Sequence, residues 1–177
     1  DGECNILMIH GSLQGLNVIP SDPEMMNKNP FLADDIKSGL NYLALGHFHN
    51  YFDRQYVGCT IVNPGSPEKL SWAEMNDEKG FVWAELHGSE TSIEFVKLST
   101  RPMETKEMNL SKEVQYPPSI KDSVITFLSG ISEKEKILKL NLRGLISQEQ
   151  YTQLRVNEIL SACRDMFFHL ILDRREL

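Results

Sequence analysis

Two short segments combine glycine and histidine in a way that could hold a metal ion. The first is Ile9-His10-Gly11, and the second is Gly46-His47-Phe48-His49. Each follows a short continuous apolar run, residues 5–9 and 42–45, which is typical of a buried strand in a sheet covered on both faces. Ligands of open α/β sheets bind beyond the carboxyl ends of the strands, so we expect both segments at one site.

Imidazole nitrogens bind Mn, Fe and Zn, so His10, His47 and His49 are the candidate metal ligands. His47 and His49 are two residues apart, and in an extended segment their rings would point the same way. The remaining histidines are interpreted as ordinary polar residues, His87 in an expected turn and His169 inside an expected strand.

A two-metal phosphoesterase also needs anionic ligands, because two dications held close together must be neutralised. Asp34 and Asp35 are adjacent and are typical of a solvated helix face, while Asp53 follows the second histidine group in a loop. Cys4 and Cys59 have apolar neighbours and are interpreted as packing residues. The ligand set therefore looks incomplete within this chain.

The elements around these segments alternate between strands and helices. In the first part, residues 11–30 are expected to form a long loop and residues 31–38 a short helix. Residues 56–62 are expected to form a hairpin around a glycine, and residues 81–86 and 92–98 a second one.

The second part is expected to contain a βαβ unit. A helix is predicted over residues 120–128, and strands are predicted over 136–142 and 166–172. Between the strands, Ser147 begins a helix with Gln150 in the capping-box position. The fold class is therefore α/β, with an α+β character in the second part.

Composition excludes several classes of protein. Of the 177 residues, 41% are hydrophobic and 24% charged, which disfavours disorder, and no apolar run is long enough to cross a membrane. Three widely spaced cysteines favour a reducing cytoplasm over a disulfide scaffold.

The charge is unevenly distributed along the chain. Residues 1–100 carry six basic and fourteen acidic side chains, a net charge of −8, and residues 101–177 carry a net charge of +1. With a polar stretch at 100–118, this indicates a domain boundary there.

The histidine segments resemble the last two metal motifs of calcineurin-like metallophosphoesterases. The stretch that follows them, Pro64-Gly65-Ser66-Pro67-Glu68 and then Lys79-Gly80-Phe81, is similar to that of SbcD-like (meiotic-recombination-eleven-type) DNA-repair exonucleases. Residues 101–177 resemble the small capping domain of that family. The resemblance implies the C-terminal half of a two-sheet metallophosphoesterase sandwich in residues 1–100, followed by a small βαβ-containing capping domain.

The family's earlier motifs, Asp-x-His, Gly-Asp and Gly-Asn-His, do not occur in this sequence. They supply the bridging aspartate, the asparagine ligand and the general-acid histidine. We therefore expect the chain to be the C-terminal half of a longer nuclease, to carry no catalytic acid of its own, and to be inactive alone. The missing N-terminal half is then one of its partners.

The resemblance implies two-metal hydrolysis of DNA phosphodiesters in double-strand break repair, by 3′ to 5′ exonuclease and single-strand endonuclease action. His10 and His47 would bind one divalent ion and His49 the other. Manganese is the first expectation, with Mg, Fe and Zn as alternatives. Asn63 and Ser66 are expected near the site without an assigned role.

The other expected partners are DNA and an SbcC-like SMC-family ATPase, with a homodimer left open and no membrane association. The expected location is the cytoplasm, in association with the nucleoid. Lys136, Lys139 and Arg143 are the candidate DNA-binding residues of the capping domain. Their alternative interpretation is a solvated strand edge, since Lys136 and Lys139 have opposite parity and cannot share one strand face.

Two other functions remain open. The chain could belong to another metallophosphoesterase that acts on small phosphodiesters or phosphoproteins. It could also be a non-catalytic fragment that binds DNA or a protein partner.

Overall fold

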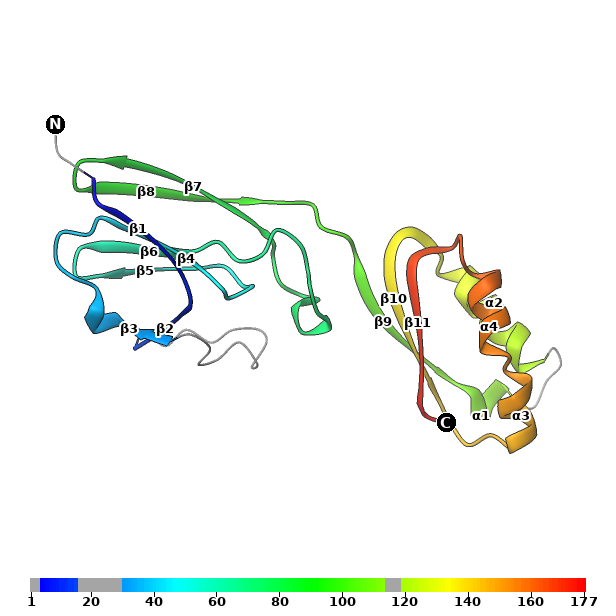
Figure 1. The fold of residues 1–177 in the computed structure, drawn as a ribbon. Helices are drawn as coiled ribbons and strands as arrows, with labels where there is room; N and C mark the ends of the chain where they lie inside the picture. Colours follow the sequence, from blue (N-terminus) through cyan, green and yellow to red (C-terminus); the bar gives the residue numbers. More distant parts are fainter. Residues whose placement is uncertain (1–3, 16–29, 114–118) are drawn as a thin grey trace. The chain divides into compact units, whose positions relative to one another are not determined.

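A computed structural model describes residues 4–15, 30–113 and 119–177 (Figure 1). The chain divides into two compact units, Asp1–Thr100 (unit 1) and Arg101–Leu177 (unit 2), and each is described by itself. The identification of unit 1 with half of a phosphoesterase domain and of unit 2 with a capping domain stays a prediction. The predicted mixed α/β class is confirmed by the strands and helices of both units.

Unit 1 is built on a four-stranded sheet with the order β1-β4-β6-β5. Strands β1 (Ile6–His10), β4 (Tyr42–Gly46) and β6 (Cys59–Asn63) are parallel, and β5 (Phe52–Tyr56) is antiparallel to β6. The predicted strands and the predicted first hairpin are therefore confirmed. The core of the unit lies against β4 and β6, where Leu43 and Ile61 are fully buried.

The prediction that β1 is buried on both faces is wrong. Ile6, Leu7 and Met8 are 57%, 44% and 80% exposed. Among the described residues β1 pairs only with β4, so it is an edge strand, and its apolar run has no second neighbour to pack against.

The predicted helix over residues 31–38 is also wrong. Pro30–Leu32 forms strand β3, which pairs in parallel with β2 (Ser12–Gln14) inside the expected loop; residues 16–29 of that loop lie outside the described residues. Within residues 31–38, all of which the structure describes, the only helical turn is a 3₁₀ turn, η2 (Ala33–Asp35). The Leu32 backbone N–H donates to the Asp35 carboxylate at 3.1 Å, and extended backbone at Ile36 ends the turn.

The predicted second hairpin of unit 1 is confirmed. Strands β7 (Gly80–His87) and β8 (Glu90–Lys97) are antiparallel and form a separate two-stranded sheet. A second 3₁₀ turn, η3 (Trp72–Glu74), precedes β7.

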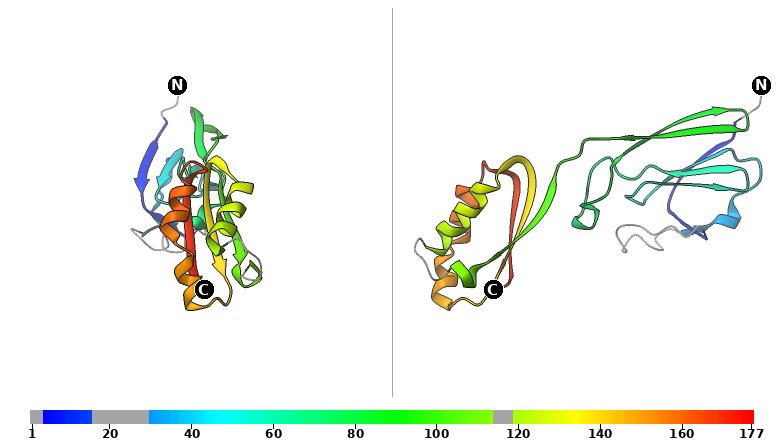
Figure 2. Two further views of the ribbon diagram at one scale, coloured as in Figure 1. Left: turned by 90° about the vertical axis from the view of Figure 1, so that its right-hand side faces the viewer. Right: turned by 180° about the vertical axis from the view of Figure 1, so that it is seen from behind.

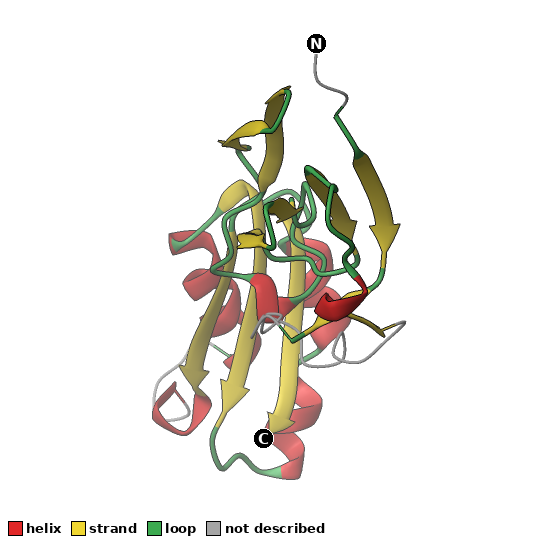
Figure 3. Ribbon diagram, turned by 90° about the vertical axis from the view of Figure 1, so that its left-hand side faces the viewer, coloured by secondary structure: helices red, strands yellow, loops and turns green. Residues whose placement is uncertain are grey.

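Unit 2 is a three-stranded parallel sheet with the order β11-β10-β9 (Figure 3). Its strands are β9 (Met103–Asn109), β10 (Glu133–Arg143) and β11 (Phe167–Glu176). Its helices are α1 (Leu110–Glu113), α2 (Ile120–Gly130), α3 (Gln148–Gln153) and α4 (Val156–Ala162). They gather on one face of the sheet, as Figure 2 shows, and this face holds the core. The most deeply buried core side chains include Leu110, Leu128, Leu138, Leu140, Leu142, Leu154 and Ile159.

The predicted βαβ unit is confirmed, but the strand beside it was missed and its single predicted helix is two helices. Strand β9 occupies part of the stretch interpreted as a polar linker, so unit 2 contains two parallel crossovers. The helix that begins after Ser147 has the predicted capping box, but it stops at Leu154. Arg155, in the left-handed region at φ 44°, separates α3 from α4.

Among the described residues, no helix is long and apolar enough to span a membrane. The longest, α2, has 11 residues, whereas a span needs about 20.

Candidate metal centre

The ends of two parallel strands bring His10 and His47 together. His10 is the last residue of β1 and lies beside Gly46, the last residue of β4. The rings of His10 and His47 meet edge to face, with centroids 5.3 Å apart. A Cβ at Gly46 would lie 3.0 Å from Nδ1 of His10, so glycine leaves the room that the His10 ring occupies. Two imidazoles held side by side at a strand end suit a divalent transition metal.

The backbone of His47 is unusual. Its φ of 107° lies in a region that residues with a side chain rarely adopt. Such conformations cost about 1–3 kcal/mol and concentrate at functional sites. The sequence-based argument for parallel His47 and His49 rings assumed an extended segment, and this assumption is wrong, because β4 ends at Gly46 and the chain turns at His47.

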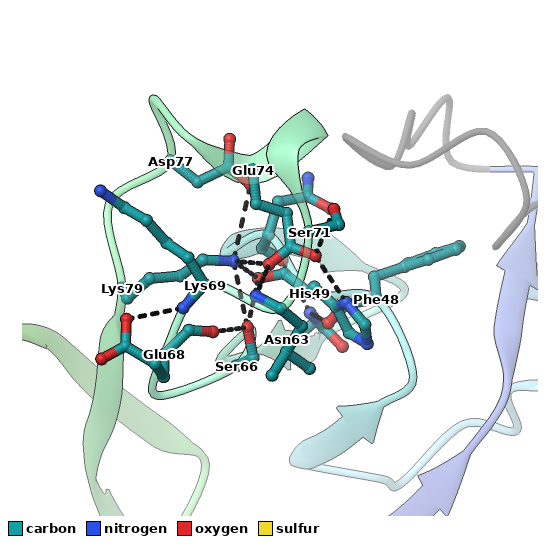
Figure 4. A network of polar contacts seen from close by, with 12 residues as sticks. Phe48, His49, Asn63, Ser66, Glu68, Lys69, Ser71, Glu74, Asp77 and Lys79 are labelled. Carbon is teal, nitrogen blue, oxygen red and sulfur yellow. Dashed lines mark hydrogen bonds and ion pairs between the residues drawn. The ribbon is translucent and has the colours of Figure 1, made fainter. Parts of the chain in front are cut away.

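His49 is held by a different set of contacts, drawn in Figure 4. Its Nδ1 lies 2.9 Å from Oε1 of Glu74, which is fully buried. The same carboxylate accepts hydrogen bonds from Ser71 Oγ at 3.1 Å and from the Leu70 backbone N–H at 3.2 Å. Its Oε2 also accepts from Lys79 Nζ at 2.7 Å.

Lys79 is buried as deeply as Glu74 and uses its ammonium group to hold the same loop. Its Nζ donates to the His49 carbonyl oxygen at 2.7 Å and to Ser66 Oγ at 3.0 Å, and it lies 3.6 Å from an Asp77 carboxylate oxygen. The ammonium has three hydrogens, and its hydrogen bonds to Glu74, His49 and Ser66 use all of them.

The electrostatics of Glu74 follow from these contacts. Burial alone would raise the pKa of the carboxyl group, but the hydrogen bonds from Lys79, His49 and the Leu70 N–H, together with the charge of Lys79, lower the pKa to about 2. Glu74 is therefore an ionised hydrogen-bond acceptor inside the protein.

Asn63 and Ser66, which the sequence placed near the site without a role, hold the histidine loop. Asn63 Nδ2 donates to the carbonyl oxygens of Phe48 and Asn50 at 2.9 and 2.8 Å. The Ser66 backbone N–H donates to the His49 carbonyl at 3.1 Å. Sequence reasoning assigned no role to Glu74 or Lys79, although both lie within residues 62–81, the stretch on which the family resemblance rests.

Residues 4–15, 30–113 and 119–177 contain no cluster of three or more His, Cys, Asp and Glu side chains that could hold a metal ion. His10 and His47 are neighbours, and the ring of His49 is bound to Glu74. Asp34 and Asp53 each accept a hydrogen bond from a tyrosine. The donor set therefore fits one part of a metal centre.

The three candidate DNA-binding residues of unit 2 all form ion pairs with carboxylates of the same unit. Lys136 Nζ pairs with Glu104 at 2.8 Å and with Glu133 at 3.0 Å. Lys139 Nζ pairs with Asp173 at 3.4 Å. The Arg143 guanidinium pairs with Glu107 at 3.0 Å and with Glu176 at 2.8 Å. Lys136 shares the parity of the buried Leu138, whereas Lys139 and Arg143 alternate with it. The structure does not bring the three side chains to one face.

The structure places His10 at the end of β1 and His47 directly after the parallel, neighbouring strand β4. Histidines at such strand ends are part of the metallophosphoesterase resemblance. No protein-family profile matches the chain. Similarity to curated proteins nevertheless supports this class. The chain is 33% identical over 99 residues to an uncharacterized metallophosphoesterase, YhaO of Bacillus subtilis, an alignment that covers 54% of this chain and 22% of that protein.

Two further relatives narrow the class. Over 125 residues the chain is 27% identical to the DNA double-strand break repair protein Mre11 of Thermoplasma acidophilum, covering 68% of this chain and 32% of the relative. It is 31% identical over 81 residues to the protein of the same name from Methanopyrus kandleri, an alignment that covers 45% of this chain and 16% of that protein. The chain thus spans about a third or less of the length of these relatives. The predicted resemblance is confirmed: the chain is similar to Mre11-like metallophosphoesterases, and its fold is consistent with part of their α/β sandwich.

Proposed function

We propose that this chain is part of a two-metal nuclease that hydrolyses DNA phosphodiesters in double-strand break repair, as a 3′ to 5′ exonuclease and single-strand endonuclease. The observation that carries the proposal is the contact between the rings of His10 and His47 at the ends of β1 and β4. The names of the Mre11 relatives support DNA as the substrate.

His10 and His47 would bind one divalent ion and His49 the other. Two such ions, with Mn as the first choice and Mg, Fe or Zn as alternatives, would supply Lewis acids for the phosphate and its attacking water. The chain's own residues position the ligands. Gly46 leaves room for the His10 ring, and the turn at His47 directs the chain away from β4.

The remaining ligands and the general-acid histidine would come from an N-terminal half of the same domain. Two observations support this part of the proposal. Among the described residues β1 is an edge strand whose apolar residues Ile6, Leu7 and Met8 are 44–80% exposed, and a mostly apolar hollow of about 650 Å³ lies beside that strand. Its apolar lining residues are Leu7, Ile9, Phe31, Ile36, Leu40 and Leu43. A protein without that half would be inactive, because the donor set would be incomplete.

The test uses the full-length protein with Mn²⁺ and a labelled DNA duplex and single strand. We expect His49→Ala to lose at least about 100-fold in cleavage rate, since removing a metal ligand removes the ion that it holds. His87→Ala is the matched control, because His87 is exposed at the end of β7, and it should cleave normally. Normal cleavage by a folded His49→Ala variant would contradict the proposal.

DNA contact by unit 2 is a separate part of the proposal. Lys139 and Arg143 lie on the strand face away from the buried leucines and would contact phosphates after exchanging their carboxylate partners. The double variant Lys139→Ala/Arg143→Ala should lower the slope of log affinity against log salt by about 2, because each phosphate contact contributes about 0.9. An unchanged salt slope would refute contact through these two residues.

An SbcC-like SMC-family ATPase and a second copy of the chain are the proposed protein partners, and the nucleoid region of the cytoplasm is the proposed location.

The similarity to YhaO, whose name does not mention DNA, favours one second candidate, a phosphoesterase for small phosphodiesters or phosphoproteins. A substrate panel separates the two: hydrolysis of a cyclic nucleotide or a phosphopeptide with DNA left intact would favour the second. The third candidate, a non-catalytic binding fragment, predicts DNA or protein binding without cleavage by the full-length protein.

A further inference from the structure

We propose that Glu74 and Lys79 are positioning residues that fix His49 from two sides, the imidazole through Glu74 and the backbone carbonyl through Lys79, so that Nε2 of His49 is the nitrogen that binds a divalent cation. The inference rests on the proposed function, because the cation is the one that His49 would hold there. In this proposal both residues act through His49, so they are positioning residues and not catalytic residues.

The contacts of Glu74 fix the tautomer of His49. The Glu74 carboxylate accepts hydrogen bonds from Lys79, Leu70 and Ser71, so both of its oxygens act as acceptors. At 2.9 Å from Oε1, Nδ1 of His49 must therefore be the protonated nitrogen that donates. The lone pair is then on Nε2, which lies on the other side of the ring. A carboxylate that accepts from one ring nitrogen orients a histidine for metal binding through the other.

The backbone of His49 is also held in place. Two donors converge on its carbonyl oxygen, namely Lys79 Nζ at 2.7 Å and the Ser66 N–H at 3.1 Å, while the Ser66 hydroxyl donates to the Glu68 carbonyl at 2.7 Å. Lys79 is itself fixed, because its own carbonyl accepts from the Leu98 N–H at 2.8 Å. The ring and the main chain of His49 are thus tied to one buried ion pair.

Stability alone does not explain the buried ion pair of Glu74 and Lys79. Burying a carboxylate and an ammonium costs several kcal/mol per charge in desolvation, and apolar residues of similar volume are often as stable or more stable. The pair is therefore weak as a stabilising device. It differs from the pair between Lys97 and Glu78, whose side chains are 63% and 65% exposed.

The experiment compares Glu74→Leu/Lys79→Met with the control Glu78→Leu/Lys97→Met. Each double variant removes both charges of one ion pair from unit 1. Glu74→Leu/Lys79→Met also removes the cation 3.6 Å from the Asp77 carboxylate, so circular dichroism first establishes that each variant is folded. Glu74→Gln is an additional variant that keeps the volume of the side chain.

The first readout needs no metal. ¹⁵N NMR of histidine-labelled chain, with the His49 signals assigned by comparison with His49→Gln, gives the tautomer directly. We expect Nδ1–H in the wild type and in the control, and a mixture with Nε2–H in Glu74→Leu/Lys79→Met. Glu74→Gln should retain a smaller share of Nδ1–H than the wild type, because a neutral amide is a weaker acceptor.

The second readout is the affinity of the full-length protein for Mn²⁺, measured by calorimetry. Affinity should fall 10–100-fold in Glu74→Leu/Lys79→Met and stay unchanged in the control. A wild-type tautomer and wild-type affinity in a folded Glu74→Leu/Lys79→Met would overturn the inference and leave the proposed function standing. If His49→Ala cleaves DNA normally while the tautomer still follows Glu74, the proposed function fails and the orientation of His49 by Glu74 stands.

Discussion

Replacing Gly65 with alanine should destabilise unit 1 more than the same replacement at Gly58. Both glycines lie in the left-handed region, at φ 78° and 76°, so the backbone cost is the same in the two variants. That cost is about 1–2 kcal/mol for alanine, and the lower entropy of the unfolded chain offsets about 0.4–1 kcal/mol of it. A Cβ at Gly58 meets nothing within 4 Å, whereas at Gly65 it would lie 2.8 Å from the His49 carbonyl oxygen and 3.1 Å from Asn50 C and Tyr51 N.

The contact at Gly65 involves main-chain atoms, which cannot turn aside as a flexible side chain could. Overpacking of this kind costs about 1–3 kcal/mol. We therefore expect Gly58→Ala to lose about 1 kcal/mol and Gly65→Ala to lose about 1–3 kcal/mol more.

Urea unfolding followed by tryptophan fluorescence measures this difference. Trp72 and Trp83 are the two tryptophans of the chain, and both lie in unit 1, so the signal reports on that unit. Equal free energies of unfolding for Gly58→Ala and Gly65→Ala, within about 0.5 kcal/mol, would refute the argument from close backbone approach.

Three other predictions concern both units. Leu140→Ala should destabilise unit 2 by about 2–5 kcal/mol, measured by urea unfolding and circular dichroism, while Leu145→Ala, at a residue 93% exposed, should change it by less than about 0.5 kcal/mol; equal effects would contradict the assigned core. Ser147→Ala should cost about 1 kcal/mol by removing the capping box of α3, seen as faster amide exchange in that helix, and unchanged exchange would contradict the cap. Burial first, and then the hydrogen bond to Asp53 with its negative charge, raise the pKa of Tyr51 to about 12, so the stability that this phenol contributes is present below pH 10 and is lost as the pH rises toward 12. Asp53→Asn should lower the pKa in an NMR titration of the ring, and an unchanged value would show that burial alone sets it.

The strands that carry the candidate metal ligands were predictable because their chemistry is local. A short apolar run followed by glycine and histidine indicates a strand and a sharp exit, and both β1 and β4 have this form. The exposure of β1 could not be predicted in this way, because burial depends on which strands lie beside it.

Strand β9 was missed because charged residues occupy its inward-facing positions. Glu104 and Lys106 share the parity of the buried Met108, and a polar residue at such a position hides the alternation of a half-buried strand. In the structure these charges are neutralised, Glu104 by Lys136 and by Lys106 at 2.8 and 2.6 Å. The break at Arg155 was also unpredictable, since no glycine or proline marks it.

In the candidate site, sequence reasoning found the histidines and missed the residues that hold them. Glu74 and Lys79 lie in a polar segment where charged side chains are usually solvated, and only the fold shows that both are buried against His49. Glu74 and Lys79 are only five residues apart, but His49, which both contact, lies 25 residues from Glu74 and 30 from Lys79 in the sequence.

The contacts of Lys79 constrain how this segment can change during evolution. Losing His49 alone leaves the buried Glu74 with one donor fewer, and losing Glu74 alone leaves an ammonium with a carbonyl and a hydroxyl as its close acceptors. A protein with only one of these residues replaced is therefore less stable, whereas replacing them together leaves no unpaired partner among the three. We expect positions 49, 74 and 79 to covary among homologues, so that a lineage which abandons the metal ligand also abandons the charged pair behind it.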